Sequence, residues 1–292
     1  MGDFKLFNNI QRIDTLSSDF PDRLRHIPDP PGQIYCTGDL SLLNADSVSV
    51  VGSRRYTVYG KAVAMMIGRR LGECGIPVVS GLAYGIDAFS HEGALEAGGR
   101  TIGVLASGIL KMGPRKNHEL MMRGLKNGGL VVSEYPPEQE AAKYTFPQRN
   151  RIISALGRCL VVVEANFNSG ALITAQHASE QGRQVYAVPG NINSQFSAGS
   201  NFLIRDGAIP LVVIDDLIRD LGVDPAASME QRTELGDDEN LIYTSVSRHE
   251  GASIDTVSRE TGLSTGLISS IVTVLEIKGI VETYGGKIYL AK

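Results

Sequence analysis

The chain has 292 residues, of which 42% are hydrophobic and 21% charged, enough for one large globular domain and a small one. Its net charge of -4 excludes a uniformly basic nucleic-acid-binding protein, so any such function requires a local basic patch. The three cysteines are widely spaced and have no histidines near them, which indicates neither a disulfide framework nor a zinc site. The N-terminus lacks the apolar run of a signal peptide, and we expect a cytoplasmic protein with no membrane contact.

Residues 1–46 carry little periodic signal and a turn-rich run of prolines, so we expect an extended N-terminal lead-in. From Ser47 to residue 222, brief β-branched runs alternate with helical patterns; the runs are VSVV, IPVVS, RTIGVL, GGLVVS, CLVVVE and QVYAV. This alternation predicts an α/β fold, a Rossmann-like doubly wound and mostly parallel sheet with helices on both faces. Asp87 is the expected N-cap of the second crossover helix.

Residues 223–238 have little apolar periodicity and are expected to form a linker. Residues 239–292 contain three helical segments, capped in part by Ser253 and Ser264, and two short strands around Gly285-Gly286. This pattern predicts a small C-terminal winged-helix domain. Residues 237–292 hold eight acidic and five basic residues, and the expected recognition helix carries only Lys278 as a base. A duplex-reading role is therefore disfavoured, and contact with a protein, self-association or modulation of the main domain suits this acidic domain better.

Glycine and small polar residues follow several predicted strands, for example at 52–55, 80–85, 166–170 and 189–191. In a parallel sheet these loops share one edge, where helix N-termini present N–H groups to anions. The glycines at 166–170 and 189–190 either contact phosphate or serve only as turns. The first loop does not match G-x-G-x-x-G, and the chain has no Walker A loop and no complete H-E-x-x-H. We therefore predict no cofactor, no metal and no catalytic residues.

An aromatic residue among cations lies in the stretch around residue 146, where Phe146 is flanked by Lys143, Arg149 and Arg151, with Arg54 and Arg55 expected on the same edge. Stacking faces beside cations are typical of proteins that bind single-stranded nucleic acid. Each residue also has a plainer interpretation. Phe146 can be a hydrophobic staple, and each arginine of the helix can pair with Glu164 or cap a carbonyl. For Asp87, Glu134 and Glu164 the default role is capping of loops or pairing with an arginine.

Several motifs together resemble one known family. They are GSRRYTVYG, SGLAYGIDAFSHEGALEAGGRTIGVL, SEYPP, FPQRNRIISAL, VVVEANFNSGALITAQHASEQGRQVYAVPG and SAGSNFLIRDGA. In order and spacing they are similar to the DNA-processing protein A (DprA/Smf) family, over about residues 20–212.

The resemblance implies a non-enzymatic protein that forms a homodimer, binds single-stranded DNA and loads the RecA recombinase onto it during natural transformation. By motif position it places Arg54 and the FPxRNR residues Phe146, Arg149, Asn150 and Arg151 in the DNA pocket. Around them we expect DNA contacts from Gly52, Ser53, Arg55, Lys143, Ser169 and Gly170.

The chain departs from the family pattern after the third predicted strand, where Leu110 and Gly113 replace the usual aspartate and tyrosine. One wall of the pocket is therefore expected to differ.

Two alternative functions stay open. One is a nucleoside-monophosphate phosphoribohydrolase, whose P-G-G-x-G-T-x-x-E motif is missing here. The other is a transcription regulator that acts through the winged helix.

Overall fold

The structure is a computed structural model that describes residues 9–112, 117–225, 236–249, 251–277 and 279–290. The chain divides into two compact units, Met1–Ser228 and Met229–Lys292. Gly113, Lys278 and residues 226–235 of the expected linker lie outside the described residues. Among the described helices, none is long and apolar enough to cross a membrane.

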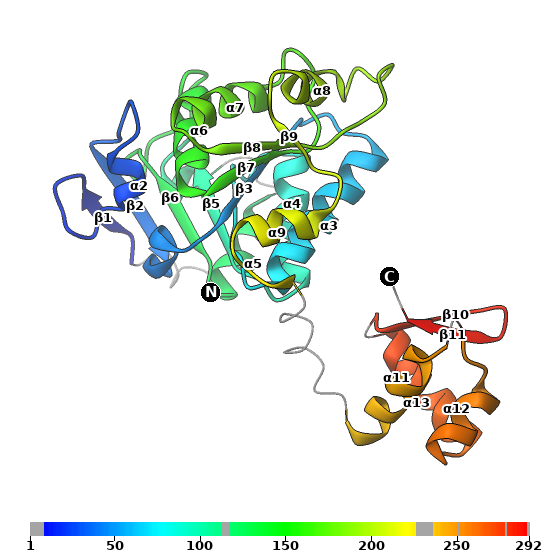
Figure 1. The fold of residues 1–292 in the computed structure, drawn as a ribbon. Helices are drawn as coiled ribbons and strands as arrows, with labels where there is room; N and C mark the ends of the chain where they lie inside the picture. The colour runs from blue at the N-terminus through cyan, green and yellow to red at the C-terminus, as the bar shows by residue number, and fades with distance from the viewer. Residues whose placement is uncertain (1–8, 113–116, 226–235, 250, 278, 291–292) are drawn as a thin grey trace. The chain divides into compact units, whose positions relative to one another are not determined.

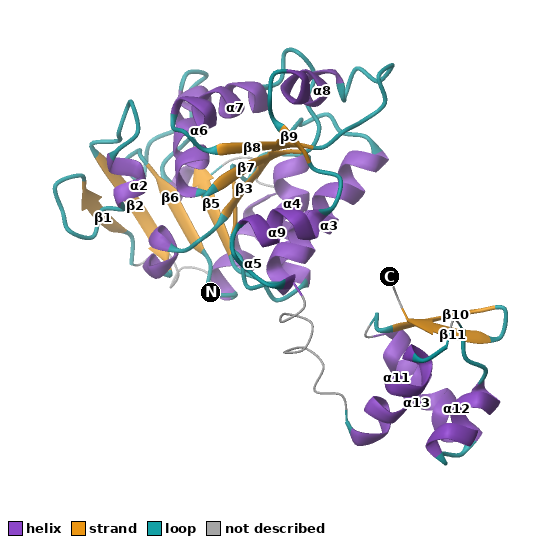
Figure 2. Cartoon of the chain, in the orientation of Figure 1, coloured by secondary structure: helices purple, strands orange, loops and turns teal. Residues whose placement is uncertain are grey.

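The described part of the first unit contains a nine-stranded sheet in the order β1-β2-β6-β5-β4-β3-β7-β8-β9 (Figure 2). Neighbouring strands from β6 to β9 along this order run parallel, whereas β2 pairs antiparallel with β6 and β1 antiparallel with β2. The prediction of a mostly parallel sheet is confirmed. The strands are β1 (Gln11–Asp14), β2 (Gln33–Gly38), β3 (Val48–Val51), β4 (Val78–Ser80), β5 (Thr101–Leu105), β6 (Leu130–Ser133), β7 (Cys159–Val162), β8 (Gln184–Ala187) and β9 (Ile209–Pro210).

The segment expected to be an extended lead-in joins this sheet. It contributes β1, β2, the short helix α2 (Asp22–Arg25) and the 3₁₀ turn η1 (Leu40–Asn44). Phe20, Leu24 and Ile34 are buried in the main core, which explains why the segment folds back onto the sheet. Its apolar residues are too few and too widely spaced to show a periodicity in the sequence.

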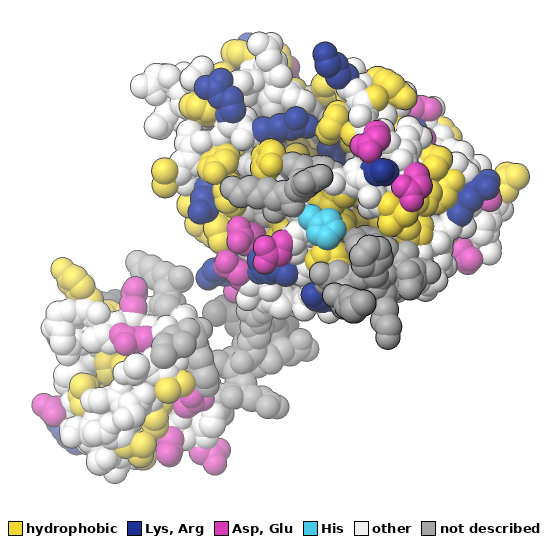
Figure 3. All heavy atoms as spheres, turned by 180° about the vertical axis from the view of Figure 1, so that it is seen from behind, with side chains coloured by type: hydrophobic (Ala, Val, Ile, Leu, Met, Phe, Trp, Pro, Cys, Tyr) yellow, Lys and Arg dark blue, Asp and Glu magenta, His cyan; other side chains and the backbone are white. Residues whose placement is uncertain are grey.

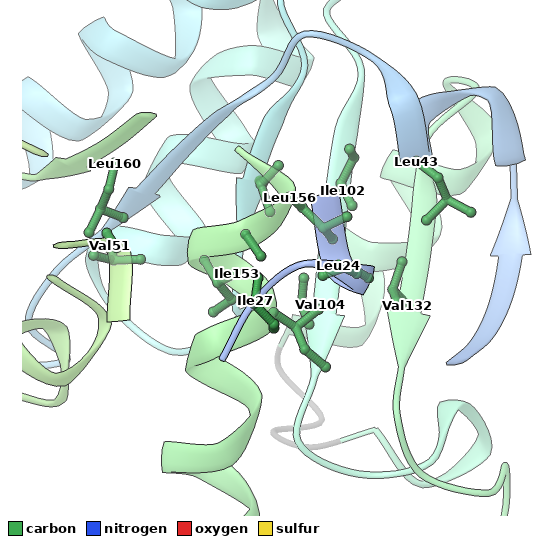
Figure 4. Close-up of a cluster of buried hydrophobic side chains, with 14 of the residues drawn as sticks. Leu24, Ile27, Leu43, Val51, Ile102, Val104, Val132, Ile153, Leu156 and Leu160 are labelled. Carbon is green, nitrogen blue, oxygen red and sulfur yellow. The ribbon is translucent and has the colours of Figure 1, made fainter. Parts of the chain in front are cut away.

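Helices cover both faces of the sheet (Figure 1). The helices α3 (Val58–Glu73), α4 (Ile86–Glu96) and α9 (Ile214–Asp220) pack on one face with Val48 and Val50 of the central strand. On the other face, α6 (Thr145–Leu156) and α7 (Gly170–Glu180) pack with Val51, Ile102 and Leu160, as Figure 4 shows in part. The remaining elements of this unit are η2 (Ile109–Lys111), α5 (His118–Lys126) and α8 (Ala198–Arg205).

The second unit has the predicted winged-helix composition. It contains α11 (Asp237–Ser247), α12 (Ile254–Thr261), α13 (Thr265–Ile277), β10 (Val281–Tyr284) and β11 (Lys287–Leu290) around its own apolar core. Ser253 caps α12, since its side chain accepts a hydrogen bond from the Thr256 N–H. Gly285 and Gly286 have φ angles of 59° and 75°, which a two-residue hairpin turn of type I′ requires.

Candidate nucleic-acid interface

A cavity of about 360 Å³ opens where the order of the sheet changes direction. From β3 the chain builds outward through β4, β5 and β6, and then returns to place β7 on the other side of β3. In doubly wound sheets, ligands bind in the crevice beyond the carboxyl ends of the strands at such a point. The cavity is lined by residues 51–55 after β3, by residues of the 166–174 segment after β7, and by one face of α6.

The loop after β3 forms the first wall and is held rigidly. The Ser53 N–H donates to the Glu164 carbonyl oxygen at 2.7 Å, and the Ser53 hydroxyl accepts from the Arg55 N–H at 3.1 Å. A Cβ on Gly52 would lie 2.7 Å from Ile86, so only glycine fits there. The loop therefore presents the exposed side chains of Arg54 and Arg55 at the cavity in a defined position.

Phe146 and Arg54 both line the cavity, and their side chains are in contact. Phe146 lies in the first turn of α6, inside the helix and not before it, where a hydrophobic staple residue would stand. The Arg54 guanidinium carbon is 5.1 Å from the centre of the Phe146 ring, a cation–π contact. The ring is half-buried and Arg54 is exposed, so an aromatic face and a positive charge are held together at the surface.

Arg149 is buried at the base of the cavity. Its guanidinium donates to the Gly81 carbonyl oxygen at 2.7 Å and to the Val104 carbonyl oxygen, at the carboxyl ends of β4 and β5. Burial lowers the pKa of Arg149 to about 10, which leaves it charged at neutral pH. The interpretation that this arginine caps carbonyls is confirmed, and the residue also lines the cavity.

The structure does not bring Arg151 or Lys143 to the cavity lining. Arg151 follows Arg149 by two residues, a turn of about 200° on a helix, and so lies on another face of α6. There its buried guanidinium pairs with Asp29 at 2.8 Å and with Glu134 at 2.7 Å. Lys143 precedes α6 and is exposed. Glu164 does not pair with either arginine of α6, because its carboxylate accepts from the Thr57 N–H and hydroxyl.

The opposite wall is the start of α7. The Ser169 side chain caps this helix by accepting from the Ala171 N–H at 3.3 Å. Gly170 is exposed, and a Cβ there would meet nothing within 4 Å, so its backbone stays open to the cavity that it lines. Asn150 Nδ2 donates to the Gly170 carbonyl oxygen at 3.3 Å and so links α6 to α7 at the cavity. Both helices thus form one binding surface.

Sequence reasoning missed several lining residues. Helical spacing could have found Ile153, which follows Phe146 and Asn150 on one face of α6, and Thr174, which follows Gly170 on α7. The other lining residues that were not predicted as contacts are Val51, Ala83, Asp87, Pro147, Asn166, Asn168, Ala171 and Ile173. Ala83, Asn166 and Asn168 do lie in loops that the glycine pattern indicated, but nothing in the sequence distinguishes them within those loops.

The prediction that Asp87 is the N-cap of α4 is wrong, and its place in the cavity lining was not predicted. Gly85 occupies the N-cap of α4, and Asp87 lies in its first turn, where a carboxylate oxygen accepts from the Gly81 N–H at 3.1 Å. Burial raises the pKa of Asp87. The Asp87 carboxylate thus fixes the loop after β4, as Glu164 fixes the start of α3. The default roles expected for these two carboxylates are confirmed, as is the arginine pairing of Glu134.

Pro189 and Gly190 line a different cavity, with Tyr59 and Glu164. Asn201 holds this turn by hydrogen bonds to the N–H and the carbonyl oxygen of Gly190, at 3.1 and 3.0 Å. Of the two interpretations of these residues, the structure supports the turn, because their polar groups already have partners.

The charge of the main cavity is positive although the chain is acidic. Three arginines line it, and Asp87 is the only acidic residue of the lining. On the face drawn in Figure 3, charges of both signs mix, with Lys and Arg side chains dispersed among Asp and Glu. Within the described ranges, no group of three or more His, Cys, Asp or Glu side chains is arranged to hold a metal ion. This cavity therefore provides the kind of local basic patch that nucleic-acid binding by an acidic chain requires.

Comparison with known families agrees with the motifs. A family model described as DNA recombination-mediator protein A matches residues 11–222. The chain belongs to this family. A second model, the DprA winged helix domain, matches residues 226–287. The resemblance to DprA/Smf proteins is thereby confirmed, together with the winged-helix assignment.

Several DprA relatives are similar over most of this chain. The DNA processing protein DprA of Bacillus subtilis is 40% identical over 73% of this chain and 71% of its own length. Protein Smf of Escherichia coli is 39% identical over 69% of this chain, which spans 54% of that longer protein.

Two solved DprA structures share the fold. The Streptococcus pneumoniae protein superposes with a TM-score of 0.68 at 37% identity, covering 74% of this chain and 76% of that one. The Helicobacter pylori protein, whose structure is described as giving insight into its single-stranded DNA binding mode, has a TM-score of 0.65 at 30% identity, covering 73% and 95%.

Proposed function

We propose that this DprA-family chain binds single-stranded DNA in the cavity between α6 and α7. One observation carries the proposal, the Arg54–Phe146 pair at the mouth of a cavity lined by three arginines. A base stacks on an aromatic face only when it is unpaired, and each such stack contributes roughly 1–3 kcal/mol. Arg54 and Arg55 are exposed and can reach the phosphates on either side of that base.

The proposed contact set follows the geometry. Phe146 stacks on a base, Arg54 and Arg55 bind phosphate, and Arg149 and Asn150 form the base of the cavity. Backbone groups of Gly52, Ser53, Ser169 and Gly170 complete the walls. Arg151 supports α6 from behind, and Lys143 can meet the strand only outside the cavity.

As the family resemblance implies, we propose that the chain acts as a homodimer that loads RecA onto the bound strand, and that it does so on DNA taken up in transformation. RecA-catalysed ATP hydrolysis on DNA already covered by a competing single-strand binder should rise when the chain is added. Sedimentation equilibrium should give twice the mass of the chain. If ATP hydrolysis does not rise, the proposed loading of RecA is wrong. If the chain sediments as a monomer at micromolar concentration, the proposed homodimer is wrong.

A phosphoribohydrolase activity has less support from the geometry. The only carboxylate of the cavity lining, Asp87, is 6% exposed and already accepts a hydrogen bond from the Gly81 N–H. Glu164 lines a separate cavity and is engaged by Thr57. Incubation with AMP should therefore release no free adenine, and release of the base would revive the enzyme hypothesis.

The test is a titration of a labelled single-stranded oligonucleotide at two salt concentrations. Arg54→Ala and Phe146→Ala should each weaken binding about tenfold, and log affinity should fall by about 0.7 per phosphate contact per log unit of salt. Arg69→Ala is the matched control, because Arg69 pairs with Glu96 on the α3–α4 layer and lines neither cavity wall. Duplex DNA that binds as tightly as single-stranded DNA, or full affinity in both variants, would overturn the proposal.

A further inference from the structure

A second cavity of about 350 Å³ adjoins the first and shares four of its lining residues. These are Arg54, Ala83, Phe146 and Arg149. The Arg54–Phe146 pair therefore stands as a partition between two cavities of similar size. Both volumes fall within the range of roughly 300–1,000 Å³ that is usual for small-molecule sites.

The far wall of the second cavity repeats the chemistry of the first. It presents an aromatic side chain, Tyr84, which is 45% exposed, and a cation, Lys111. Tyr84 shares the lining of this cavity with Arg54 and Arg149. A stacking surface beside positive charge is thus present on both sides of the partition.

The loop that carries Tyr84 is strained and tightly held. Leu82 has a φ angle of +51°, and no other non-glycine residue in the described parts of the chain has a positive φ. Asn117 Nδ2 holds the Leu82 carbonyl oxygen at 2.8 Å, and Asp87 holds the Gly81 N–H. Such strain costs about 1–3 kcal/mol and persists at sites where the surrounding structure imposes one conformation. Here it fixes the turn that displays Tyr84.

Lys111 is positioned by an equally defined turn. The Leu110 N–H donates to the Pro137 carbonyl oxygen at 3.0 Å, and the Gly108 N–H to the Gln139 carbonyl oxygen at 2.8 Å. Lys111 faces two exposed glutamates, Glu140 at 3.5 Å and Glu138 at 3.9 Å. An exposed pair of this kind contributes little stability, so a phosphate can compete for the lysine.

We propose that the second cavity, with Tyr84 and Lys111, is a further nucleotide subsite for the strand that occupies the first. The proposal rests on the proposed function. Phe146 then separates two neighbouring nucleotides, the second base stacks against Tyr84, and its phosphate displaces Glu140 from Lys111. The departure from the family pattern at Leu110 lies in the turn that sets Lys111, so this subsite is a place where the chain can differ from its relatives.

The experiment measures affinity for oligothymidylates of increasing length. Tyr84→Ala should weaken binding of long oligomers about fivefold or more, and Tyr84→Phe should retain it. Lys111→Ala should weaken binding and reduce the slope of log affinity against log salt by about 0.7, the value for one phosphate contact. Glu140→Gln should strengthen binding about twofold at low salt, since it removes the nearer of the two carboxylates that face the lysine. Glu96→Gln makes the same charge change at the Arg69 pair and should have no comparable effect.

A fluorescent base analogue separates the outcomes. The analogue is placed at the nucleotide that the second subsite holds. Stacking on Tyr84 should quench its fluorescence in the unaltered protein, and this quenching should be lost in Tyr84→Ala. If Phe146→Ala loses affinity while the Tyr84, Lys111 and Glu140 variants match the unaltered chain, the second subsite is wrong and the proposed function stands. If Phe146→Ala also binds normally, both are wrong.

Discussion

The two units of the chain keep their charged side chains in different places. The buried charged and histidine side chains that the structure describes all lie in the first unit, namely Asp87, His91, Arg149, Arg151 and Glu164. In the described part of the winged-helix unit, the only buried polar side chain is Ser245. Burial forces a charge to find partners in a fixed geometry, whereas an exposed charge is solvated and mobile.

Hydroxyl groups of α13, the expected recognition helix, also differ from the polar groups of the cavity, because they are hydrogen-bonded within their own helix. The hydroxyls of Ser269, Ser270 and Thr273 on α13 donate to carbonyl oxygens one turn earlier, at 2.9, 3.1 and 3.0 Å. These donors are used within the helix, and α13 has no base in its last turn among the described residues. A nucleic-acid site therefore requires more than a suitable fold, because the donors and charges must also point outward.

The largest expected effect is on Arg149. Arg149→Met should lower the free energy of unfolding of the first unit by about 3 kcal/mol, since two carbonyl oxygens lose a charged donor and Asp87 loses its cation. Urea unfolding measures the change. Arg259→Met on α12, where the side chain is exposed, should change it by less than about 0.5 kcal/mol. Equal losses in both variants would contradict the contrast between the units.

The second prediction concerns acid stability. Burial lowers the pKa of His91 to about 4 from its ordinary value of 6.5. Between these values the unfolded state binds a proton that the folded state rejects, so stability falls as pH drops from 6.5 to 4. The loss should reach about 2 kcal/mol at pH 5. It should be absent from His91→Phe, and a pH-independent difference between the two proteins would contradict it.

The winged-helix unit should respond to acid later. His249 pairs there with Glu260 at 2.7 Å, and hydrogen bonds from Ser245 and His249 lower the pKa of Glu260. The contribution of Glu260 to stability is present in full above its ordinary pKa of 4.5. It is lost only as the pH falls through the lowered pKa of the folded state. Following the two units by separate spectroscopic probes should show the first unit weakening at a higher pH than the second.

A further prediction separates binding from stability at the cavity. Arg54→Met keeps an aliphatic stem against Phe146 but removes the exposed charge. We expect single-stranded DNA to bind about tenfold more weakly, while the free energy of unfolding changes by less than about 0.5 kcal/mol. Fluorescence anisotropy and thermal unfolding measure the two quantities. A stability loss like that of Arg149→Met would show that Arg54 supports the fold.

The smallest effect is expected in the winged-helix unit. Replacing Arg259 and Lys287 by alanine removes two of its exposed cations. Single-stranded DNA affinity should change by less than about twofold, because the proposed contacts lie in the other unit. A loss as large as that of Arg54→Met would assign the winged helix to the DNA interface and remove the contrast between the units.

Local patterns predicted most of the fold. The six β-branched runs form β3 to β8, and Ser253 and the Gly285-Gly286 pair take the capping and turn positions expected of them. These features depend on neighbours within a few residues, so the sequence carries them directly. The strands β1 and β2 were not predicted, because β2 is stabilised by pairing with β6, which lies about a hundred residues away, and β1 pairs only with β2.

Motifs that are contiguous in the chain were enough to predict the fold class, the family and the stretch in which we propose the site. The roles of the cations of α6 could not be predicted in this way, because they depend on packing. Arg149 turns to the ends of β4 and β5, and Arg151 turns to Asp29 and Glu134, because two residues along a helix point in nearly opposite directions. Which partners meet them there depends on segments distant in sequence. This packing decides whether an arginine of α6 lines the cavity or holds the helix in place, and no local sequence pattern encodes that difference.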